Sequence, residues 1–504
     1  MSGMTHQLRC LKQHGDKPAY ALFAEMGTGK TWIAMMNAVD LWRRGHVDAV
    51  LVFAPNGVQT NWTRIELPKH MPKDVQWRAA AWSSGNTKEE RQKVAELCYP
   101  SATGVLRFLA MNWEAIQTEK GFVCAETFCR SSHKLMIVCD ESDNVKDPRA
   151  KRTKALMKLK KYATWRRVMT GTPIDGSPFS AFAQFNFLDA AILGTTSYTA
   201  FKAEYAEMLP AGSPLLNAIV KKGNLRFTPQ ITAKDASGRP KYRNLEQLKR
   251  LIDPYTFRVK KEECLDLPKK MYKTVLFSLT KEQDAIYEKC EEECRLMFEG
   301  IDTPFARLTI ATKLTQITSG YYLHPNSPEP VRIEGRNPKL DLLVERVQTI
   351  VDAGAQVIIW ARYTVEIEDI MRRLGEAKIS AGSYYGATTR DARTEAIDAF
   401  ERGTIPVFVG NQQAGGTGIT LIAASYVIYF SNNFRLRDRL QSEDRAHRIG
   451  QTKTVTYINI AAENTIDEAV VRNLESKKNV ADMIVDGKFP LYRKEMRDGQ
   501  RQGV

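Results

Sequence analysis

The chain has 504 residues, of which 43% are hydrophobic and 26% are charged. This is the balance of a soluble globular protein, and the length predicts two or three domains. The longest apolar runs, such as residues 49–54, are only as long as a strand, and the N-terminus carries no apolar signal segment. A membrane-spanning protein and a secreted protein are therefore not expected.

Positive charge is in excess and is clustered. Lys and Arg number 73 against 58 Asp and Glu, a formal net charge of +15. Residues 144–168 hold ten basic residues and one acid, and residues 221–243 hold seven and one. Such clusters favour a polyanionic partner, above all nucleic acid, over a uniformly solvated basic surface. The eight cysteines lack CxxC spacing and are expected to be free thiols in a reducing cytoplasm.

Apolar strands alternate with amphipathic helices in two separate blocks. The expected strands are 20–24, 49–55, 134–140 and 166–173 in the first block, and 356–361, 406–411, 426–431 and 455–462 in the second. Between the blocks the pattern is mainly helical, around a basic, loop-like stretch at 228–244. The alternation predicts two mostly parallel sheets, whose functional groups lie at the carboxyl ends of the strands.

The first expected strand ends in a phosphate-binding pattern, Ala24-x4-Gly29-Lys30-Thr31. Gly27 and Gly29 allow backbone N–H groups to approach phosphates. Lys30 is placed to neutralise the β- and γ-phosphates, and the Thr31 hydroxyl to ligate Mg²⁺. A strand before the pattern and a helix after it favour this interpretation over a chance glycine turn.

Two further strands of the first block end in polar residues. The stretch KLMIVCDESD places Asp140 to hold Mg²⁺ through water and Glu141 to orient or deprotonate the attacking water. In MTGTP, Thr170 and Thr172 are candidates for a hydrogen-bond relay, with a plain Gly-Thr-Pro turn as the alternative.

The second block offers candidate partners for the phosphates. In QSEDRAHRIGQ, the spacing predicts Gln441, Arg445 and Arg448 on one face of a helix, and two arginines there suit the charge of a transition-state phosphate. The stretch NQQAGGTGIT follows a strand but lacks a Gly-Lys-Ser/Thr end. A contact to a nucleic-acid backbone therefore fits it better than a second nucleotide site.

In this order, the motifs resemble those of superfamily-two helicases, and within them those of Swi/Snf-type DNA translocases. Motifs I, Ia, II and III are matched by FAEMGTGKT, VLVFAPNGVQTNW, VCDESD and VMTGTPIDGSPFSAFAQFNFLD. The segment between the lobes is matched by VKKEECLDLPKK and LTKEQDAIYEK. Motifs IV, IVa, V and VI are matched by VIIWARYT, YYGATTRDARTEAIDAF, AGGTGITLIAASYVIYF and DRAHRIGQTKTV. The chain departs from the family's pattern at Ala24, where Asp is usual, and at Asp143, where DESD replaces DEAH or DEGH.

The resemblance implies an α/β fold of two RecA-like parallel-sheet lobes (P-loop NTPase) with a helical insertion, and ATP bound between the lobes. The implied boundaries are 1–180 for lobe 1 (the ATP-binding domain), 181–335 for a helical protrusion and inter-lobe segment, 336–480 for lobe 2 (the helicase C-terminal domain) and 481–504 for a tail.

The resemblance also assigns roles to residues. Catalysis is expected from Lys30, Asp140, Glu141, Arg445 and Arg448, with Thr31 and Asp140 as ligands of Mg²⁺. Nucleotide contacts are expected from Gln7 (as an adenine-reading glutamine, with an ordinary surface residue as the alternative), Met26, Gly27, Thr28, Gly29, Lys30, Thr31, Gly418, Gln441, Arg445 and Arg448. Contacts to nucleic acid are expected from Pro55, Asn56, Asn112, Lys146, Gln412, Gly416, Thr417 and Lys241.

The expected function is ATP-dependent translocation along duplex or branched DNA, in replication, recombination or repair. Strand separation, an ATP-gated clamp without processive movement, and an RNA substrate are the alternatives, and single-stranded DNA is a further candidate track. ATP and Mg²⁺ are the expected cofactors, and replication or recombination proteins the candidate partners. No membrane partner is expected. A small, stand-alone prokaryotic or phage-type monomer in a bacterial or host cytoplasm is the form that the resemblance suggests.

Overall fold

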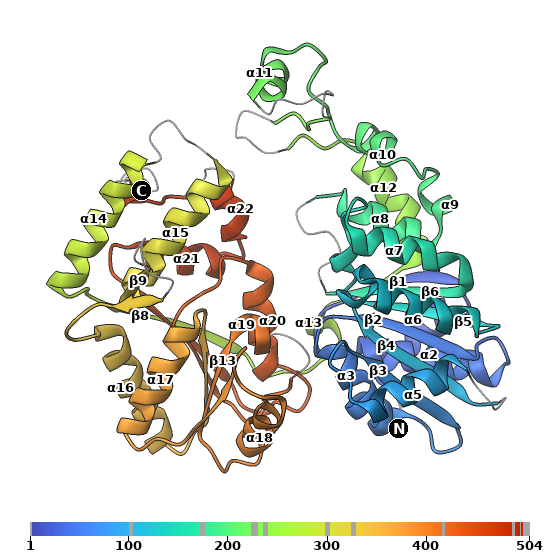
Figure 1. Ribbon diagram of the computed structural model, residues 1–504, viewed down its shortest axis with the longest axis horizontal. Helices are drawn as coiled ribbons and strands as arrows, with labels where there is room; N and C mark the ends of the chain where they lie inside the picture. Colours follow the sequence, from blue (N-terminus) through green and yellow to red (C-terminus); the bar gives the residue numbers. More distant parts are fainter. Residues whose placement is uncertain are drawn as a thin grey trace. The chain divides into compact units, whose positions relative to one another are not determined.

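The computed structural model describes residues 3–99, 104–171, 177–222, 230–234, 240–297, 303–323, 329–415, 419–485, 489–493 and 495–496. The chain divides into two compact units, unit 1 at residues 1–265 and unit 2 at residues 266–504. Each unit is built around its own parallel sheet (Figure 1).

Unit 1 contains a seven-stranded parallel sheet in the order β3-β4-β2-β5-β6-β1-β7. Its strands are β1 (Ala19–Ala24), β2 (Ala49–Ala54), β3 (Trp77–Trp82), β4 (Leu106–Asn112), β5 (Leu135–Asp140), β6 (Ala163–Thr170) and β7 (Thr256–Val259). The central strands β1, β2 and β5 are buried along their whole length, which explains their continuous apolar runs.

Helices cover both faces of this sheet, and alternate strand residues belong to two separate cores. The helices are α1 (Thr5–His14), α2 (Lys30–Arg43), α3 (Val58–Asn61), α4 (Leu67–His70), α5 (Lys88–Cys98), α6 (Glu119–Arg130) and α7 (Lys151–Leu159), followed by α8 (Ser180–Leu188), α9 (Ala190–Leu193), α10 (Tyr198–Tyr205), α11 (Pro214–Lys222), α12 (Leu245–Ile252) and α13 (Lys261–Cys264). Within unit 1, helices α10 and α11 extend away from the sheet (Figure 1).

Unit 2 contains a six-stranded parallel sheet in the order β12-β13-β11-β14-β15-β8. Its strands are β8 (Lys270–Phe277), β11 (Val357–Ala361), β12 (Ala381–Tyr384), β13 (Val407–Asn411), β14 (Tyr426–Tyr429) and β15 (Val455–Ala462), and β9 (Tyr321–Leu323) and β10 (Pro330–Arg332) form a small antiparallel pair. The helices are α14 (Lys281–Met297), α15 (Pro304–Thr318), α16 (Pro338–Asp352), α17 (Thr364–Glu376), α18 (Arg390–Glu401), α19 (Gln412–Gly415), α20 (Leu436–Ala446), α21 (Ile466–Glu475) and α22 (Val480–Val485).

The predicted fold class, two parallel-sheet α/β lobes, is confirmed. All eight expected strands form, although their ends shift by a few residues. The eight cysteines are free thiols, as predicted. The domain boundaries inferred from the sequence stay predictions. Among the described helices, none is long and apolar enough to cross a membrane.

Candidate active site

The phosphate-loop motif joins β1 to α2 in unit 1. Gly27 and Gly29 have φ angles of 79° and 83°, which favour glycine. The Lys30 ammonium turns back into the loop and donates to the carbonyl oxygens of Ala24 and Glu25 at 2.9 and 3.4 Å. Lys30 is therefore held at the carboxyl end of β1, with its charge inside the loop.

Helix α1 contacts the same loop. The Gln7 Nε2 donates to the Thr28 carbonyl oxygen at 3.3 Å, and the His6 Nε2 lies 2.8 Å from that oxygen. The Gln7 Oε1 accepts from the Met4 N–H at 2.9 Å. Gln7 is thus buried beside the phosphate loop rather than on the surface, while its expected reading of adenine stays a prediction.

Asp140, at the carboxyl end of β5, is buried and held by two tryptophans. The Trp62 Nε1 donates to the Asp140 carboxylate at 3.0 Å, and the Trp113 Nε1 donates to the Asp140 carbonyl oxygen at 3.0 Å. Burial and then the nearby Glu141 charge raise the pKa of Asp140 to about 6, against the opposing effects of the Trp62 hydrogen bond and the Lys30 charge. The motifs around Lys30 and Asp140 are therefore within electrostatic reach of each other, since only β6 separates their strands.

Glu141 has an unusual backbone conformation, with φ 50° and ψ 56°. A left-handed conformation costs a non-glycine residue about 1–2 kcal/mol, and strained residues of this kind cluster at functional sites. Its carbonyl oxygen accepts from the Asn144 N–H and Nδ2 at 3.0 and 2.8 Å. Next to it, the Ser142 hydroxyl donates to the Gln184 Oε1 on α8 at 2.6 Å. These contacts fix the direction in which the Glu141 side chain leaves the strand.

Thr31 and Asp140 provide a hydroxyl and a carboxylate oxygen, which is the donor chemistry that Mg²⁺ prefers. Both residues lie at carboxyl ends of strands of the same sheet or directly behind them. The residue set therefore fits a magnesium ion carried with a nucleotide. Thr170, at the end of β6 between them, is buried, and Thr172 lies outside the described residues.

The predicted nucleic-acid residues of unit 1 fall into two groups. Pro55 and Asn56 follow β2, and Asn112 ends the adjacent β4 and donates from its Nδ2 to the Asn56 Oδ1 at 3.3 Å. Lys146 follows the short helix after Glu141, towards the same edge of the sheet. Lys241 lies apart from them, beside α10, where it pairs with Glu207 at 3.2 Å. The first group is brought together, and all of these roles stay predictions.

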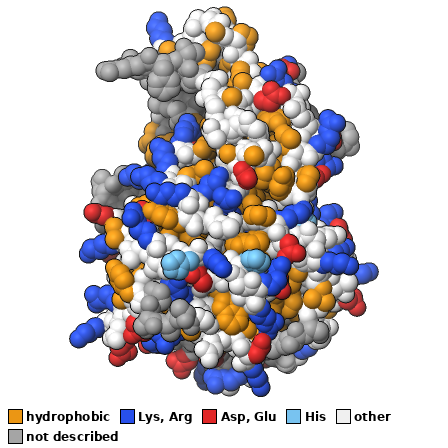
Figure 2. Space-filling model, turned by 90° about the vertical axis from the view of Figure 1, so that its right-hand side faces the viewer, with side chains coloured by type: hydrophobic (Ala, Val, Ile, Leu, Met, Phe, Trp, Pro, Cys, Tyr) orange, Lys and Arg blue, Asp and Glu red, His pale blue; other side chains and the backbone are white. Residues whose placement is uncertain are grey.

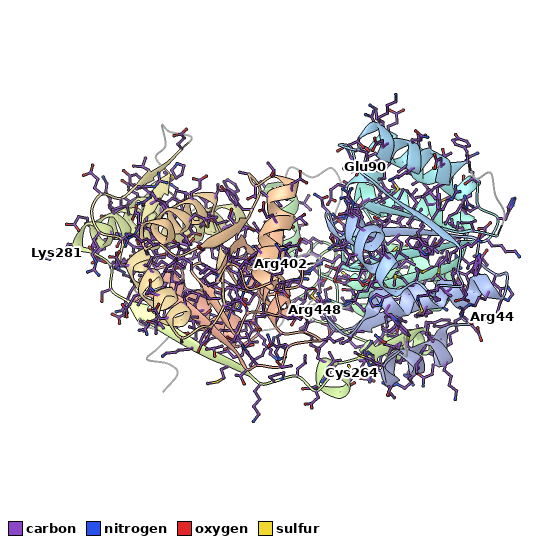
Figure 3. The ribbon with its side chains drawn as sticks, turned by 90° about the horizontal axis from the view of Figure 1, so that it is seen from below. Arg44, Glu90, Cys264, Lys281, Arg402 and Arg448 are labelled. Atoms are coloured by element: carbon purple, nitrogen blue, oxygen red, sulfur yellow. The ribbon has the colours of Figure 1, made fainter. Side chains whose placement is uncertain are left out.

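In unit 2, the two predicted arginines meet one segment, residues 419–421. The Arg445 Nη1 donates to the Ile419 carbonyl oxygen at 3.1 Å, and the Arg448 Nη1 donates to the Thr420 hydroxyl at 2.8 Å. Figure 3 labels Arg448. The prediction of a single helical face was wrong for Arg448, because α20 ends at Ala446 and His447 leaves the helical conformation.

The other predicted residues of unit 2 are less accessible. Gln441 is buried on α20, and its amide, oriented to suit its neighbours, accepts from the Arg437 Nε at 2.9 Å. Gln412 is 1% exposed, backbone included, and its Oε1 accepts from the Asn433 N–H at 2.8 Å. In this conformation the whole residue is inaccessible, and its expected contact to nucleic acid stays a prediction. Gly416, Thr417 and Gly418 lie outside the described residues.

A buried ionic network holds α20 in unit 2, and sequence reasoning missed it. The Glu443 carboxylate accepts from the Arg439 Nε, the Lys270 Nζ and the Tyr272 hydroxyl at 2.9, 2.9 and 2.8 Å. Burial alone would raise the pKa of Glu443, but the charges and hydrogen bonds of Arg439 and Lys270 bring it below its ordinary value. The network fixes the helix that carries Arg445.

Other contributors to the site also lacked a local signal. Trp62 closes the stretch that resembles motif Ia and Trp113 follows Asn112, but neither position alone indicates a contact to Asp140. His6 and Gln184 were likewise missed. An aromatic residue directly after the polar end of a strand was the available clue for Trp113.

Comparisons with known proteins agree with these motifs. Residues 7–320 match the model of the SNF2-related domain, and residues 338–450 match the model of the helicase conserved C-terminal domain. The chain belongs to the SNF2-related family. The predicted resemblance to Swi/Snf-type proteins is therefore confirmed at the level of the family.

This SNF2-related chain also resembles individual proteins. It is 26% identical to a Bacillus subtilis protein named as an ATP-dependent helicase/translocase, over 92% of this chain and 46% of that protein. It is 24% identical to the mouse chromodomain-helicase-DNA-binding protein 1-like, over 92% of this chain and 47% of that protein. The chain thus spans about half the length of these curated relatives.

Among solved structures, the SWI2/SNF2 ATPase core of Sulfolobus solfataricus in complex with dsDNA matches at 23% identity, over 97% of this chain and 94% of that chain, with a TM-score of 0.39. A likeness this low in TM-score supports no structural conclusion.

Proposed function

We propose that this SNF2-related protein hydrolyses ATP to move along duplex or branched DNA. The observation that carries the proposal is the arrangement in unit 1, where the Lys30 ammonium lies inside a phosphate loop and the buried Asp140 ends a strand of the same sheet. A phosphate loop and an Asp-Glu pair at the carboxyl ends of strands in one sheet are the parts that ATP hydrolysis needs.

In the proposed reaction, Lys30 and the loop N–H groups bind the phosphates, and Glu141 orients the attacking water and accepts its proton. Thr31 and Asp140 would hold Mg²⁺, which supplies positive charge to the β- and γ-phosphate oxygens when bound. Gln7, Met26, Gly27, Thr28 and Gly29 would complete the nucleotide contacts from unit 1.

Unit 2 would supply the remaining charge. Arg445 and Arg448 are the proposed arginines for the transition state, with Gln441 and Gly418 beside the nucleotide. A well-placed arginine of this kind contributes about three to five orders of magnitude in rate. Closing of the two units on ATP and reopening after hydrolysis would then couple the reaction to movement.

DNA is the proposed track. The names of the relatives point to helicases and DNA-binding proteins, and the net charge of +15 suits a phosphate backbone. Pro55, Asn56, Asn112, Lys146, Gln412, Gly416, Thr417 and Lys241 are the proposed contacts. Replication, recombination or repair are the proposed processes, with the chain acting as a monomer in the cytoplasm. The eight free thiols suit that compartment.

The test is the steady-state ATPase rate without nucleic acid and with single-stranded DNA, duplex DNA, a four-way junction or RNA. Strong stimulation by duplex or junction DNA that is lost in Glu141→Gln supports the proposal and identifies the DNA structure along which the protein moves. Equal, low rates in every sample, with DNA still bound in the presence of ATP, would favour an ATP-gated clamp. Preferential stimulation by RNA would show that RNA, rather than DNA, is the substrate.

A further inference from the structure

Helix α7 of unit 1 and the short 3₁₀ turn that follows it, Lys160–Tyr162, carry a row of exposed lysines. Lys151, Lys154, Lys158 and Lys161, here called the lysine stripe, follow one another at spacings of three, four and three residues. This spacing places side chains on one side of a helix. The opposite side of α7 is buried through Thr153, Leu156 and Leu159. The stripe is therefore a solvent-facing row, about 15 Å long at 1.5 Å per residue.

The positive charge of the stripe is not neutralised locally. Helix α7 contains no acidic residue, and Asp147, which precedes it, pairs with Arg149 at 3.5 Å. No ion pair joins a stripe lysine to a carboxylate within the described ranges. On the neighbouring helix α6, Glu126 accepts from the Tyr162 hydroxyl and from Arg130 at 2.8 and 3.3 Å. These contacts, led by the one from Tyr162, and the nearby Lys161 charge lower the pKa of Glu126.

Lysines elsewhere on this part of the chain have other tasks. Lys160, next to the stripe, points to the protein and donates to the Asn186 carbonyl oxygen. By contrast, no stripe lysine has a hydrogen bond to a described protein group, and the only ring contacts are those of the Lys158 and Lys161 ammonium groups, which lie 5.8 and 4.9 Å from the centroids of the Phe122 and Tyr162 rings within the described ranges. One face of the molecule shows basic side chains interspersed with hydrophobic ones (Figure 2), so charge alone does not single out a site. The helical row without acids is what distinguishes the stripe.

The direction of α7 separates the stripe from the predicted DNA contacts. The helix connects β5 to β6, which are parallel neighbours, so it runs from the carboxyl ends of the strands back towards their amino ends. Lys151 therefore lies near the carboxyl ends of the strands, where Asn56 and Asn112 also lie. Lys161 lies towards the amino ends. The stripe thus leads away from the proposed track.

We propose that the lysine stripe is a second DNA-binding surface, which holds a stretch of phosphate backbone outside the track of the motor. This inference rests on the proposed function for the identity of the polyanion. The backbone comes either from the flank of the tracked duplex or from a second arm of branched DNA. Lysine acts on phosphates as a point charge and reads no sequence, so the surface is expected to bind without sequence preference.

The test changes all four stripe lysines to glutamine, which removes their charge and keeps a good helix former at each position. A matched control removes the same charge at four exposed lysines elsewhere, Lys12, Lys88, Lys93 and Lys378. Affinity for a short duplex, a long duplex and a four-way junction is measured across salt concentrations. Thermal unfolding and the ATPase rate without DNA verify that both variants are intact.

The stripe variant is expected to bind the long duplex or the junction at least about tenfold more weakly. The slope of log affinity against log salt should fall by about 3–4, close to one per lost phosphate contact. Loss on the junction alone assigns the stripe to a second arm, and loss on the long duplex assigns it to the flank. Affinities and slopes equal to those of the control variant would overturn the proposal.

The experiments distinguish a failure of the stripe proposal from a failure of the proposed motor function. If DNA stimulates the wild-type ATPase and the stripe variant binds DNA normally, only the stripe proposal fails. If DNA does not stimulate the wild type but its binding depends on the stripe, the motor proposal fails and the stripe stands. Stripe-dependent binding of RNA in preference to DNA would overturn the assignment of DNA.

Discussion

The Ser142 hydroxyl and the Gln184 side chain form a fully buried hydrogen bond of 2.6 Å between the Asp-Glu motif and helix α8. Gln184 is held in turn, because its Nε2 donates to the Ser180 carbonyl oxygen at 2.9 Å. The pair therefore ties the residue that follows Glu141 to a rigid helix. Since Glu141 is in a strained backbone conformation, we infer that this tie helps to hold it.

Ser142→Ala should lower both stability and turnover. The substitution removes the Ser142 donor from a buried amide oxygen, which costs about 1 kcal/mol. Ser142→Ala combined with Gln184→Leu removes both partners of this hydrogen bond. If the tie positions Glu141, both variants lose kcat several-fold at an unchanged KM for ATP. An unchanged kcat in the double variant would show that the hydrogen bond is only structural.

Trp62→Phe should weaken the use of Mg²⁺. The phenyl ring keeps most of the apolar packing, but the Asp140 carboxylate loses its 3.0 Å donor. Groups that orient a metal ligand typically contribute about 10–100-fold in affinity, so the Mg²⁺ concentration for half-maximal ATPase should rise by about tenfold. Trp113→Phe is the control, because Trp113 donates to the main chain of Asp140. A Mg²⁺ dependence that matches wild type in Trp62→Phe contradicts the assignment of Asp140.

Gly29→Ala should disturb the phosphate loop, whereas Gly45→Ala places a similar left-handed strain beyond the far end of α2. Both glycines have positive φ, 83° and 71°, so either substitution costs about 1–2 kcal/mol. A Cβ on Gly29 would lie 2.1 Å from the Gln7 Nε2, whereas one on Gly45 would meet nothing within 4 Å. We expect Gly29→Ala to raise the KM for ATP at least about tenfold and Gly45→Ala to leave it unchanged. Equal effects on KM would mean that neither strain nor crowding at Gly29 disturbs the binding of ATP.

The sequence predicted the parts of this fold that have a local pattern. Strands β1, β2 and β5 are buried throughout, and their apolar runs identify them. Strand β8 was missed because it lies at the edge of its sheet and exposes most of its residues. Strand β4 is also buried, but it was missed because Arg107 interrupts its apolar run. The buried Arg107 guanidinium donates to the Leu97 carbonyl oxygen at 2.8 Å.

The candidate site shows the same division. Lys30, Asp140 and Arg445 stand in short motifs, so spacing reveals them. The groups that hold them in place come from distant parts of the chain. Trp62 precedes Asp140 by 78 residues, and Gln184 follows Ser142 by 42. No sequence period links such pairs, because the meeting of strand ends in the folded sheet creates the contact.

Glu443→Gln should destabilise unit 2 in a pH-dependent way. The substitution leaves the Arg439 guanidinium buried without its carboxylate, and breaking a buried ion pair costs about 3–5 kcal/mol. The pKa of Glu443 lies below its ordinary value in the folded protein. Its contribution to stability is therefore fully present above the ordinary value and is lost as the pH falls through the lowered one.

The difference between wild type and Glu443→Gln is thus expected to be largest near neutral pH and to shrink in acid. Urea unfolding of the full chain, with hydrogen exchange of peptides from α20 and β15, measures it. Glu468→Gln is the matched control, because Glu468 forms an exposed pair with Arg472 at 2.8 Å. Exposed pairs contribute about 0–1 kcal/mol, so that variant should stay close to wild type at every pH. A Glu443→Gln variant as stable as this control at neutral pH would show that the network does not hold α20.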